Sequence, residues 1–283
     1  MIQPVLRYHH QQARGVTACA WSPDGSRLAV SHLPRQLQLW DPASGSLLRS
    51  WPTPSTDWLT WSPDGSLLLS SSEVWDAHTG QLLLRLHSTP LALSPDGTIL
   101  ACRTTTALLL QDPRHGLFLE RLPLPEPISR IATCAWSPDG SLLAAYCSLD
   151  YPYGAIFLWQ VSTGQLLLRL RDHVGAPSAL AWSPDGSLLA SGDSNGSLSL
   201  WNPRSGQLLL RLSHPRSISS LAWSPDGSLL ASGDSNGSLS LWNPHSGQLL
   251  LRLSHSRSIS SLAWSPDGSL LASGDSNGSL SLW

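Results

Sequence analysis

The chain has 283 residues, and its 17 basic and 19 acidic side chains give a formal net charge of -2 at pH 7. This balance excludes the strong basic excess that a general binder of nucleic acid needs to displace counterions. Residues 1–20 lack the continuous apolar core of a signal peptide, and no apolar run is long enough to span a membrane. We therefore expect a cytoplasmic protein that contacts neither nucleic acid nor membrane.

Seven copies of one unit make up the sequence. Each copy contains the turn sequence SPDG, which begins at Ser22, Ser62, Ser94, Ser137, Ser183, Ser224 and Ser265. Consecutive turns lie 32 to 46 residues apart, a period typical of one propeller blade and longer than a leucine-rich or ankyrin repeat. Because blades of this kind share a continuous core, we predict a single domain over residues 1–283.

The first segment in chain order, residues 3–10, resembles the end of a unit. It aligns without a gap onto residues 248–255, the fourth predicted strand of the sixth unit, whereas the seventh unit stops at Trp283 after its third strand. We therefore predict that residues 3–10 supply the outer strand of the last blade. This pairing would join the two ends of the chain and remove an open sheet edge.

Units one to four then depart from the repeat pattern in different ways. The first carries Pro34-Arg35 at its hairpin, and the second is five residues shorter between its two tryptophans. The third unit has lost both tryptophans, and the fourth carries an insertion at residues 149–153. The chain thus divides into a divergent half and a nearly uniform half, which begins at Trp182.

The uniform unit predicts four short strands. In residues 214–253 these are SISSLAW, SLLASG, SLSLW and QLLLRL, and SPDG closes the first of them with a glycine at positive φ. Between the second and third strands, Asn236-Gly237 predicts a type I′ turn, in which both residues are left-handed. Such units bury too little apolar surface to fold alone, so we predict an all-β, seven-bladed β-propeller of four-stranded antiparallel blades.

Residues 213–250, SHPRSISSLAWSPDGSLLASGDSNGSLSLWNPHSGQLL, resemble the WD-repeat β-propeller unit, and the likeness covers essentially the whole chain. The resemblance implies that a His, a Ser, a hairpin Asp and a Trp lock each blade. By position these residues are His173, Ser191, Asn195 and Trp201; His214, Ser232, Asn236 and Trp242; and His255, Ser273, Asn277 and Trp283. Since Asn replaces Asp in all three, we expect a neutral hydrogen bond worth about 0.5 to 1.5 kcal/mol.

The resemblance also implies a binding role for one face of the molecule. This face carries the loop before each first strand, here called the leading loop, and the hairpins between second and third strands. Loops on a rigid scaffold commonly bind partners, and Arg, Trp and Tyr are enriched at such surfaces. The candidate contacts are Arg14, Trp51, Tyr151, Tyr153, Asp193, Arg216, Asp234, Arg257 and Asp275. We predict a monomeric, non-catalytic scaffold for a protein or peptide partner.

Metal and catalytic chemistry find little support in the sequence. The GDSNGS hairpins offer oxygen ligands but lack the remaining acidic positions of a calcium loop, so we predict no metal and no other cofactor. No phosphate-binding loop, nucleophile elbow or His-carboxylate metal spacing stands out, and we predict no catalytic residues. We expect Cys19, Cys102, Cys134 and Cys147 to be small buried hydrophobes.

One alternative function remains open at this point. Near-identical units over residues 182–283 would also suit a small-ligand or carbohydrate-binding propeller. Such a protein would carry equivalent pockets between its blades, about 41 residues apart and lined by aromatic side chains.

Overall fold

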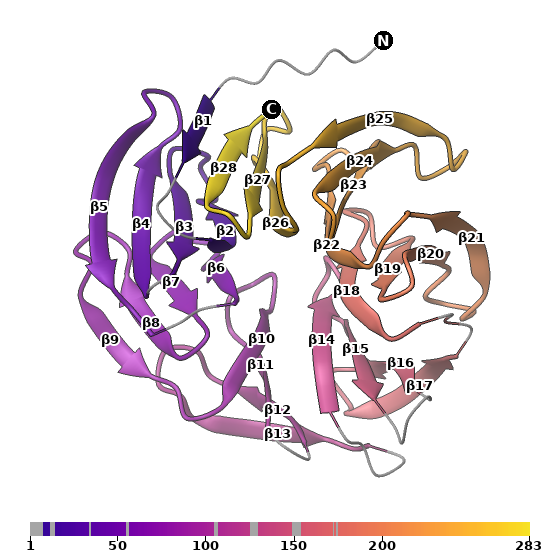
Figure 1. Cartoon of the computed structure of the whole chain (residues 1–283). Helices are drawn as coiled ribbons and strands as arrows, with labels where there is room; N and C mark the ends of the chain where they lie inside the picture. The colour runs from indigo at the N-terminus through magenta and orange to yellow at the C-terminus, as the bar shows by residue number, and fades with distance from the viewer. Residues whose placement is uncertain are drawn as a thin grey trace. The chain divides into compact units, whose positions relative to one another are not determined.

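The structure is a computed structural model that describes residues 8–11, 15–33, 35–54, 57–104, 107–124, 130–148, 154–171, 173 and 175–283. Every regular element in these residues is a β-strand, and the strands form seven four-stranded sheets, here called blades 1 to 7 (Figure 1). The prediction of an all-β chain with seven antiparallel blades is confirmed. The chain divides into two compact units, one of residues 1–83 and 219–283 and the other of residues 84–218.

The first unit holds blades 1 and 7 and nearly all of blades 2 and 6. Blade 1 consists of β2 (Val16–Trp21), β3 (Leu28–His32), β4 (Gln36–Asp41) and β5 (Ser46–Pro52). Blade 2 consists of β6 (Leu59–Trp61), β7 (Leu67–Ser70), β8 (Glu73–Asp76) and β9 (Leu82–Arg85). Blade 6 consists of β22 (Ile218–Trp223), β23 (Leu230–Asp234), β24 (Ser238–Trp242) and β25 (Leu249–Ser254). Blade 7 consists of β26 (Ile259–Trp264), β27 (Leu271–Asp275), β28 (Ser279–Leu282) and β1 (Tyr8–Gln11).

Blades 3, 4 and 5 form the second unit. Blade 3 consists of β10 (Thr89–Leu93), β11 (Leu100–Arg103), β12 (Leu108–Gln111) and β13 (Phe118–Leu122). Blade 4 consists of β14 (Arg130–Trp136), β15 (Leu142–Ser148), β16 (Gly154–Gln160) and β17 (Gln165–Leu170). Blade 5 consists of β18 (Pro177–Trp182), β19 (Leu189–Asp193), β20 (Ser197–Trp201) and β21 (Leu208–Ser213).

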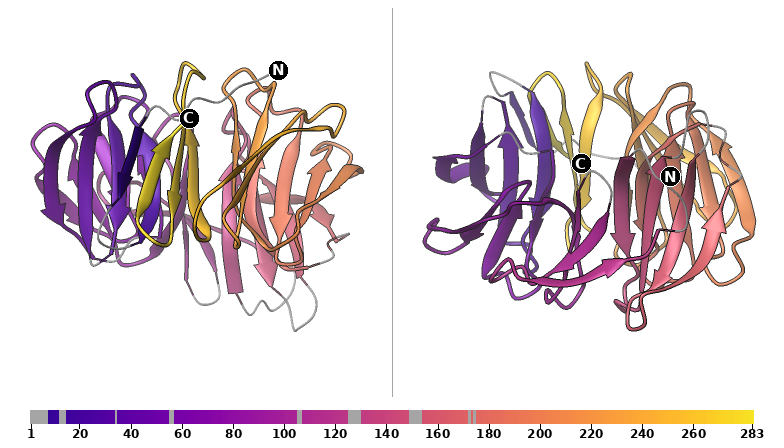
Figure 2. Two further views of the ribbon diagram at one scale, coloured as in Figure 1. Left: turned by 45° about the horizontal axis from the view of Figure 1, so that its top comes forward. Right: turned by 90° about the horizontal axis from the view of Figure 1, so that it is seen from below.

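The two ends of the chain meet in blade 7. Strand β1 pairs antiparallel with β28, and the indigo β1 lies beside the yellow β28 in both figures that show the whole chain (Figures 1 and 2). Strand β26 of the same blade packs against β2 of blade 1. The prediction that the N-terminal segment completes the last blade is thus confirmed.

The register of this strand differs from the ungapped alignment by two residues. Leu280 faces His10, whereas its equivalent in blade 6, Leu239, faces Leu253. The ungapped alignment would place Tyr8, the residue that matches Leu253, opposite Leu280. A two-residue slip keeps every side chain on its own face of the sheet, so the alternation of the sequence does not distinguish the two registers. Residues 3–7 of the predicted strand lie outside the described residues.

Every SPDG turn is stabilised from within. The seven turn glycines have φ between 70° and 73°, as the sequence predicted. In the first turn, the Ser22 hydroxyl donates to Asp24 Oδ1 at 2.6 Å, and the Ser26 N–H donates to the same oxygen at 3.0 Å. These bonds favour the ionised carboxylate and lower the pKa of Asp24 to about 2. The turn therefore carries a fixed, charged side chain at ordinary pH.

Tryptophans that precede SPDG turns join one blade to the next. In the first unit, the indole N–H of Trp21 donates to Ala263 O at 3.0 Å, and that of Trp61 donates to Ala20 O at 3.0 Å. The same bond recurs within the second unit, at 3.0 Å from Trp182 to Ala135 O. Because each donor and acceptor lie in adjacent blades, the repeated Ala-Trp sequence fixes the spacing between blades. This role was not predicted from the sequence.

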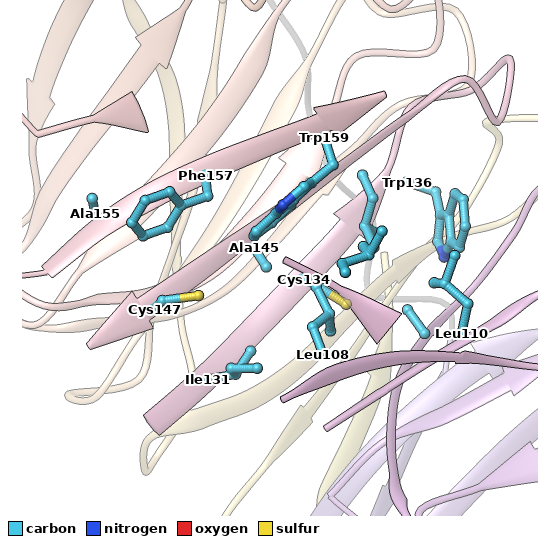
Figure 3. Close-up of a cluster of buried hydrophobic side chains, with 13 residues drawn as sticks. Leu108, Leu110, Ile131, Cys134, Trp136, Ala145, Cys147, Ala155, Phe157 and Trp159 are labelled. Atoms are coloured by element: carbon cyan, nitrogen blue, oxygen red, sulfur yellow. The ribbon is translucent and has the colours of Figure 1, made fainter. Parts of the chain in front are cut away.

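A continuous apolar core fills the junction of blades 3 and 4. Figure 3 shows Trp136, Phe157 and Trp159 packed with aliphatic side chains from both blades. Cys134 and Cys147 belong to this cluster, and all four cysteines are buried, which confirms the prediction for them. Burial raises the pKa of the Cys147 thiol to about 12, so the thiol stays protonated and unreactive at neutral pH.

Candidate functional site

The hairpins of the uniform blades do not form the predicted type I′ turn. In blade 7, Gly278 has a φ of 91°, but Asn277 is not among the residues with positive φ. Strand β27 extends to Asp275, whose C=O accepts from the Gly278 N–H at 3.1 Å. The loop is therefore one residue longer than a two-residue hairpin. As a result the aspartate, and not the asparagine, sits at the end of a buried strand.

Blade 7 contains a buried network of four side chains. His255 Nε2 lies 2.7 Å from Ser273 Oγ, and the indole N–H of Trp283 donates to the same hydroxyl at 2.7 Å. On its other side, His255 Nδ1 lies 3.3 Å from Asp275 Oδ2. Asp275 and Ser273 are 0% exposed. The network ties the leading loop of the blade to its second and third strands.

Asp275 takes the place that the sequence analysis assigned to Asn277. The other carboxylate oxygen, Oδ1, accepts from the backbone N–H groups of Asn277 and Ser279 at 3.0 and 2.8 Å. The side chain of Asn277 is exposed at the hairpin tip. The hydrogen bond that we expected from a neutral Asn side chain is therefore made by an Asp side chain. In the neighbouring hairpins the aspartates Asp193 and Asp234 are likewise buried, and the asparagines Asn195 and Asn236 are exposed.

The same side chains occur in blades 5 and 6 with differences. The indole N–H groups of Trp201 and Trp242 donate to Ser191 and Ser232 at 2.8 and 2.7 Å. In blade 5 the ring of His173 lies 5.0 Å from that of Trp201, and Asp193 Oδ2 accepts from the Gly175 N–H at 2.9 Å. His214, the leading-loop histidine of blade 6, is buried.

Divergent blades replace this network with other polar pairs. In blade 3, the Ser88 hydroxyl donates to Gln111 Oε1 at 2.7 Å, and Gln111 stands where the uniform blades have Trp. In blade 2, the Thr53 hydroxyl donates to the buried carboxylate of Glu73 at 3.0 Å. The indole of Trp159 in blade 4 donates instead to Pro123 O at 3.0 Å. Blades 2, 3 and 4 thus each use a different pair of groups.

The leading-loop face holds part of the predicted contact set. Arg216 and Arg257 are exposed there, as are the three hairpin asparagines. A Cβ on Gly237 would lie 2.6 Å from Arg257 O, which places the hairpin of blade 6 directly against the leading loop of blade 7. Gly196 lies in the same way against Arg216 O, at 2.7 Å. Exposed Asn and Arg residues therefore sit side by side at two successive positions of the repeat.

Three predicted aspartates do not belong to this surface. Asp193, Asp234 and Asp275 are no more than 2% exposed, because each caps its own hairpin from below. They position the loops and cannot touch a partner directly, which corrects the expectation for them.

The aromatic candidates also differ from expectation. Trp51 is half-buried and packs on Trp75, with ring centroids 5.8 Å apart. It therefore serves the junction of blades 1 and 2 more than an exposed surface. Arg14, Tyr151 and Tyr153 lie outside the described residues.

Two cavities of about 770 Å³ each lie on the opposite face, beside the SPDG turns. One is lined by Asp139, Trp182 and Asp185, and the other, at the equivalent position in the first unit, by Asp267, Trp21 and Asp24. Both tryptophans are 8% exposed and bound through their indole N–H to an alanine carbonyl. Repeated pockets thus exist, but they occur at the junctions of blades 4 with 5 and 7 with 1, and they present no open aromatic face to a sugar.

Within the described residues, no group of three or more His, Cys, Asp or Glu side chains is placed to hold a metal ion. The part of the chain that the structure describes contains no helix that could span a membrane.

Comparison with known proteins points to one family. Residues 118–251 match the description "IFT140 first beta-propeller", and residues 2–41 and 247–283 match "WD domain, G-beta repeat". "Telomerase protein component 1" of Rattus norvegicus is 29% identical over 206 residues, which cover 66% of this chain and 8% of that protein. The chain therefore corresponds to a small part of this relative. With its seven four-stranded blades and the repeated SPDG and Trp pattern, the chain belongs to the WD-repeat β-propeller family.

Proposed function

We propose that this chain is a non-catalytic scaffold that binds a protein or peptide partner on its leading-loop face. The proposal includes the expectations of one domain, a monomeric state and a cytoplasmic location. The observation that carries it is the combination of exposed Arg and Asn side chains with buried anchors directly beneath them. Arg257 and Asn277 are exposed, while His255 and Asp275, which fix the same loops, are buried.

Rigid anchoring is what makes such a surface suitable for binding. The leading loop of blade 7 is held to the hairpin of blade 6 by the His255 N–H, which donates to Gly237 O at 2.7 Å. It is held to its own blade by the network of Ser273, Asp275 and Trp283. A loop that is already ordered loses little conformational entropy when a partner binds, so more of the contact energy appears as affinity.

Arginine and asparagine side chains suit polar groups of a protein surface. A guanidinium donates in a fixed fork to carboxylates, and an amide both donates and accepts. Such pairs recur at Asn195 with Arg216 and at Asn236 with Arg257, and each pair suits an acidic segment of a partner. Family members commonly act through such protein contacts.

The proposal can be tested by affinity capture from extracts of the native host. The comparison is between the wild-type chain, the double variant Arg216→Ala/Arg257→Ala and the control variant Arg204→Ala. Arg204 is also exposed, but it lies on the opposite face beside an SPDG turn. We expect a partner that the wild type and the control retain and the double variant loses.

A captured partner would then be purified and its affinity for all three chains measured directly. An affinity that is at least about tenfold weaker for the double variant alone would support the proposal, since charge-assisted bonds contribute about 1.5 to 3 kcal/mol each. Equal capture and equal affinity for all three chains would remove these residues, and with them this surface, from the binding site.

A further inference from the structure

One cavity on the leading-loop face has a chemistry that the uniform blades lack. It lies between blades 3 and 4, inside the second unit, and has a volume of about 560 Å³. Residues of three segments line it: 87–89 where the leading loop of blade 3 enters β10, 103–104 at the end of β11, and 130–131 at the start of β14. All three segments belong to the divergent half of the chain.

At this cavity blade 3 has an arginine in place of a glycine that the uniform blades need for close packing on the next blade. Nine residues after the first serine of the SPDG turn, the uniform blades have Gly233 and Gly274, and blade 3 has Arg103. A Cβ at Gly233 would lie 2.6 Å from Ile259 Cγ2, and one at Gly274 would lie 2.3 Å from Val16 Cγ1. In the uniform blades the β-branched side chain of the next blade therefore fills the space above the glycine.

Arg103 cannot accept that packing, and its side chain crosses the junction instead. Its Nη1 donates to the backbone carbonyl of Ile131 at 2.7 Å, and Ile131 is the residue of blade 4 that corresponds to Ile259. This bond holds the guanidinium at the wall of the cavity. Arginine carries four N–H donors besides the one used in this bond.

The lining is basic. Arg103 is half-buried, Arg130 and His87 are exposed, and no carboxylate of the described residues lines the cavity. Hydroxyl groups of Ser88, Thr89 and Thr104 complete the polar wall. Two guanidinium groups in one concave, partly desolvated site repel each other. Together they attract an anion more strongly than a single guanidinium group does when it is surrounded by water.

We propose that this cavity binds an oxyanion, either a phosphoryl group or a carboxylate, carried by a peptide segment of the partner. The inference rests on the proposed function, because it assigns the chemistry of the partner at the same face. Guanidinium forks form short, bidentate bonds to phosphate and carboxylate oxygens. The volume lies within the range of sites for small ligands, so it admits the charged group together with neighbouring atoms of the peptide.

The test uses three short fluorescent peptides of the same Gly/Ala-based sequence that differ only at one central residue, which is phosphoserine, glutamate or serine. Binding to the full chain is measured by anisotropy at low and at physiological salt, with inorganic phosphate as competitor. We expect saturable binding of the phosphoserine or the glutamate peptide, competition by phosphate, weakening by salt and no binding of the serine peptide. The stronger of the two anionic peptides identifies which oxyanion the cavity prefers.

Variants then assign the binding to the cavity. Arg103→Gln and Arg130→Gln should each weaken it about tenfold or more, whereas Arg204→Gln should leave it unchanged. Arg130 is exposed at the beginning of a strand, so its variant should fold even if the Arg103 variant does not. Thermal unfolding of the Arg103 and Arg130 variants checks that each of them is folded.

Equal binding of all three peptides, absence of any saturable binding, or anion binding that survives both substitutions would overturn the inference. These results are separable from failure of the proposed function. If Arg216→Ala/Arg257→Ala abolishes partner binding while the cavity variants change nothing, the scaffold stands and the cavity assignment fails.

Discussion

Replacing Asp275 by asparagine tests which hairpin residue holds the blade together. The carboxylate accepts four hydrogen bonds: at Oδ1 from the N–H groups of Asn277 and Ser279, and at Oδ2 from His255 Nδ1 and Ser256 Oγ, both at 3.3 Å. An asparagine retains one oxygen and can still accept the two backbone bonds. Its amide nitrogen, in contrast, would face the two remaining donors and accept from neither.

The magnitude follows from the burial of these groups. Asp275 is 0% exposed, and the side chain of His255 is 2% exposed, so neither can turn to water. Hydrogen bonds to charged groups contribute about 1.5 to 3 kcal/mol, and two long ones belong near the lower end. We therefore expect Asp275→Asn to lower the free energy of unfolding by roughly 2 to 4 kcal/mol. Asn277→Ala, at an exposed site, should change it by less than about 0.5 kcal/mol.

Chemical denaturation followed by tryptophan fluorescence would measure both variants against the wild-type chain. The two substitutions lie two residues apart in one hairpin, so each serves as the control for the other. The assignment of Asp275 to the network would be refuted if Asn277→Ala destabilised the chain as much as Asp275→Asn, or if Asp275→Asn left the transition midpoint unchanged.

Three further predictions concern the packing and the charge of the blades. Trp21→Phe removes the indole N–H that donates to Ala263 O at 3.0 Å and should destabilise the chain by about 1 to 3 kcal/mol in thermal unfolding; an unchanged midpoint would contradict the role of this residue in joining blades. Gly274→Ala brings a Cβ to 2.3 Å from Val16 Cγ1 and should lower the free energy of unfolding by about 1 to 3 kcal/mol. Ser276→Ala, in the exposed hairpin, should leave the stability unchanged. Equal effects of the two substitutions would count against the close packing at Gly274. Hydrogen bonds from Ser22, Ser183 and Ser265 lower the pKa of Asp24, Asp185 and Asp267 from 3.8 to about 2. The stabilisation of the folded chain by these carboxylates is therefore complete above pH 3.8 and is lost as the pH falls toward 2. The corresponding Ser→Ala variants should lose less stability between these pH values than the wild-type chain, and identical acid-unfolding profiles would argue against these bonds.

The sequence predicted those features that one repeat unit determines by itself. Alternating strands, the positive φ of the SPDG glycines and the strand order within a blade all follow from local pattern, and the seven copies reinforce one another. The missing fourth strand of the last unit predicted the pairing of β1 with β28. Its register was two residues off, because that shift leaves the same side chains on the same face.

The side-chain network was harder to predict, because it depends on the length of the hairpin loop. The pair Asn236-Gly237 favours a type I′ turn, which would pair Asp234 with Leu239. In the observed turn only the glycine is left-handed, and Gly233 pairs with Leu239. The strand ends at Asp234, whose carboxylate accepts from the N–H groups of Asn236 and Ser238. A repeated Asp two residues before every Asn was the available signal, but we interpreted it as part of an exposed rim.

The contacts between blades were also missed. The acceptor alanines, such as Ala20 and Ala263, looked like small strand residues, and their carbonyls act as acceptors only when the next blade is in place. The role of Arg103 was missed for the same reason. Its position is glycine in the uniform blades, and only the packing of Ile259 on Gly233 in another junction shows what the exchange changes.

The pairing of the chain ends can be measured directly by a cross-strand disulfide. His9 and Ser281 are Cα partners in the register of β1 and β28, so His9→Cys/Ser281→Cys should form a disulfide under mild oxidation. The native cysteines are buried and should not compete. His9→Cys/Leu280→Cys places the second thiol on the opposite face of the sheet and should remain reduced. If the first pair failed to bridge, or if both pairs bridged equally, the N-terminal strand would not complete the last blade in the way described.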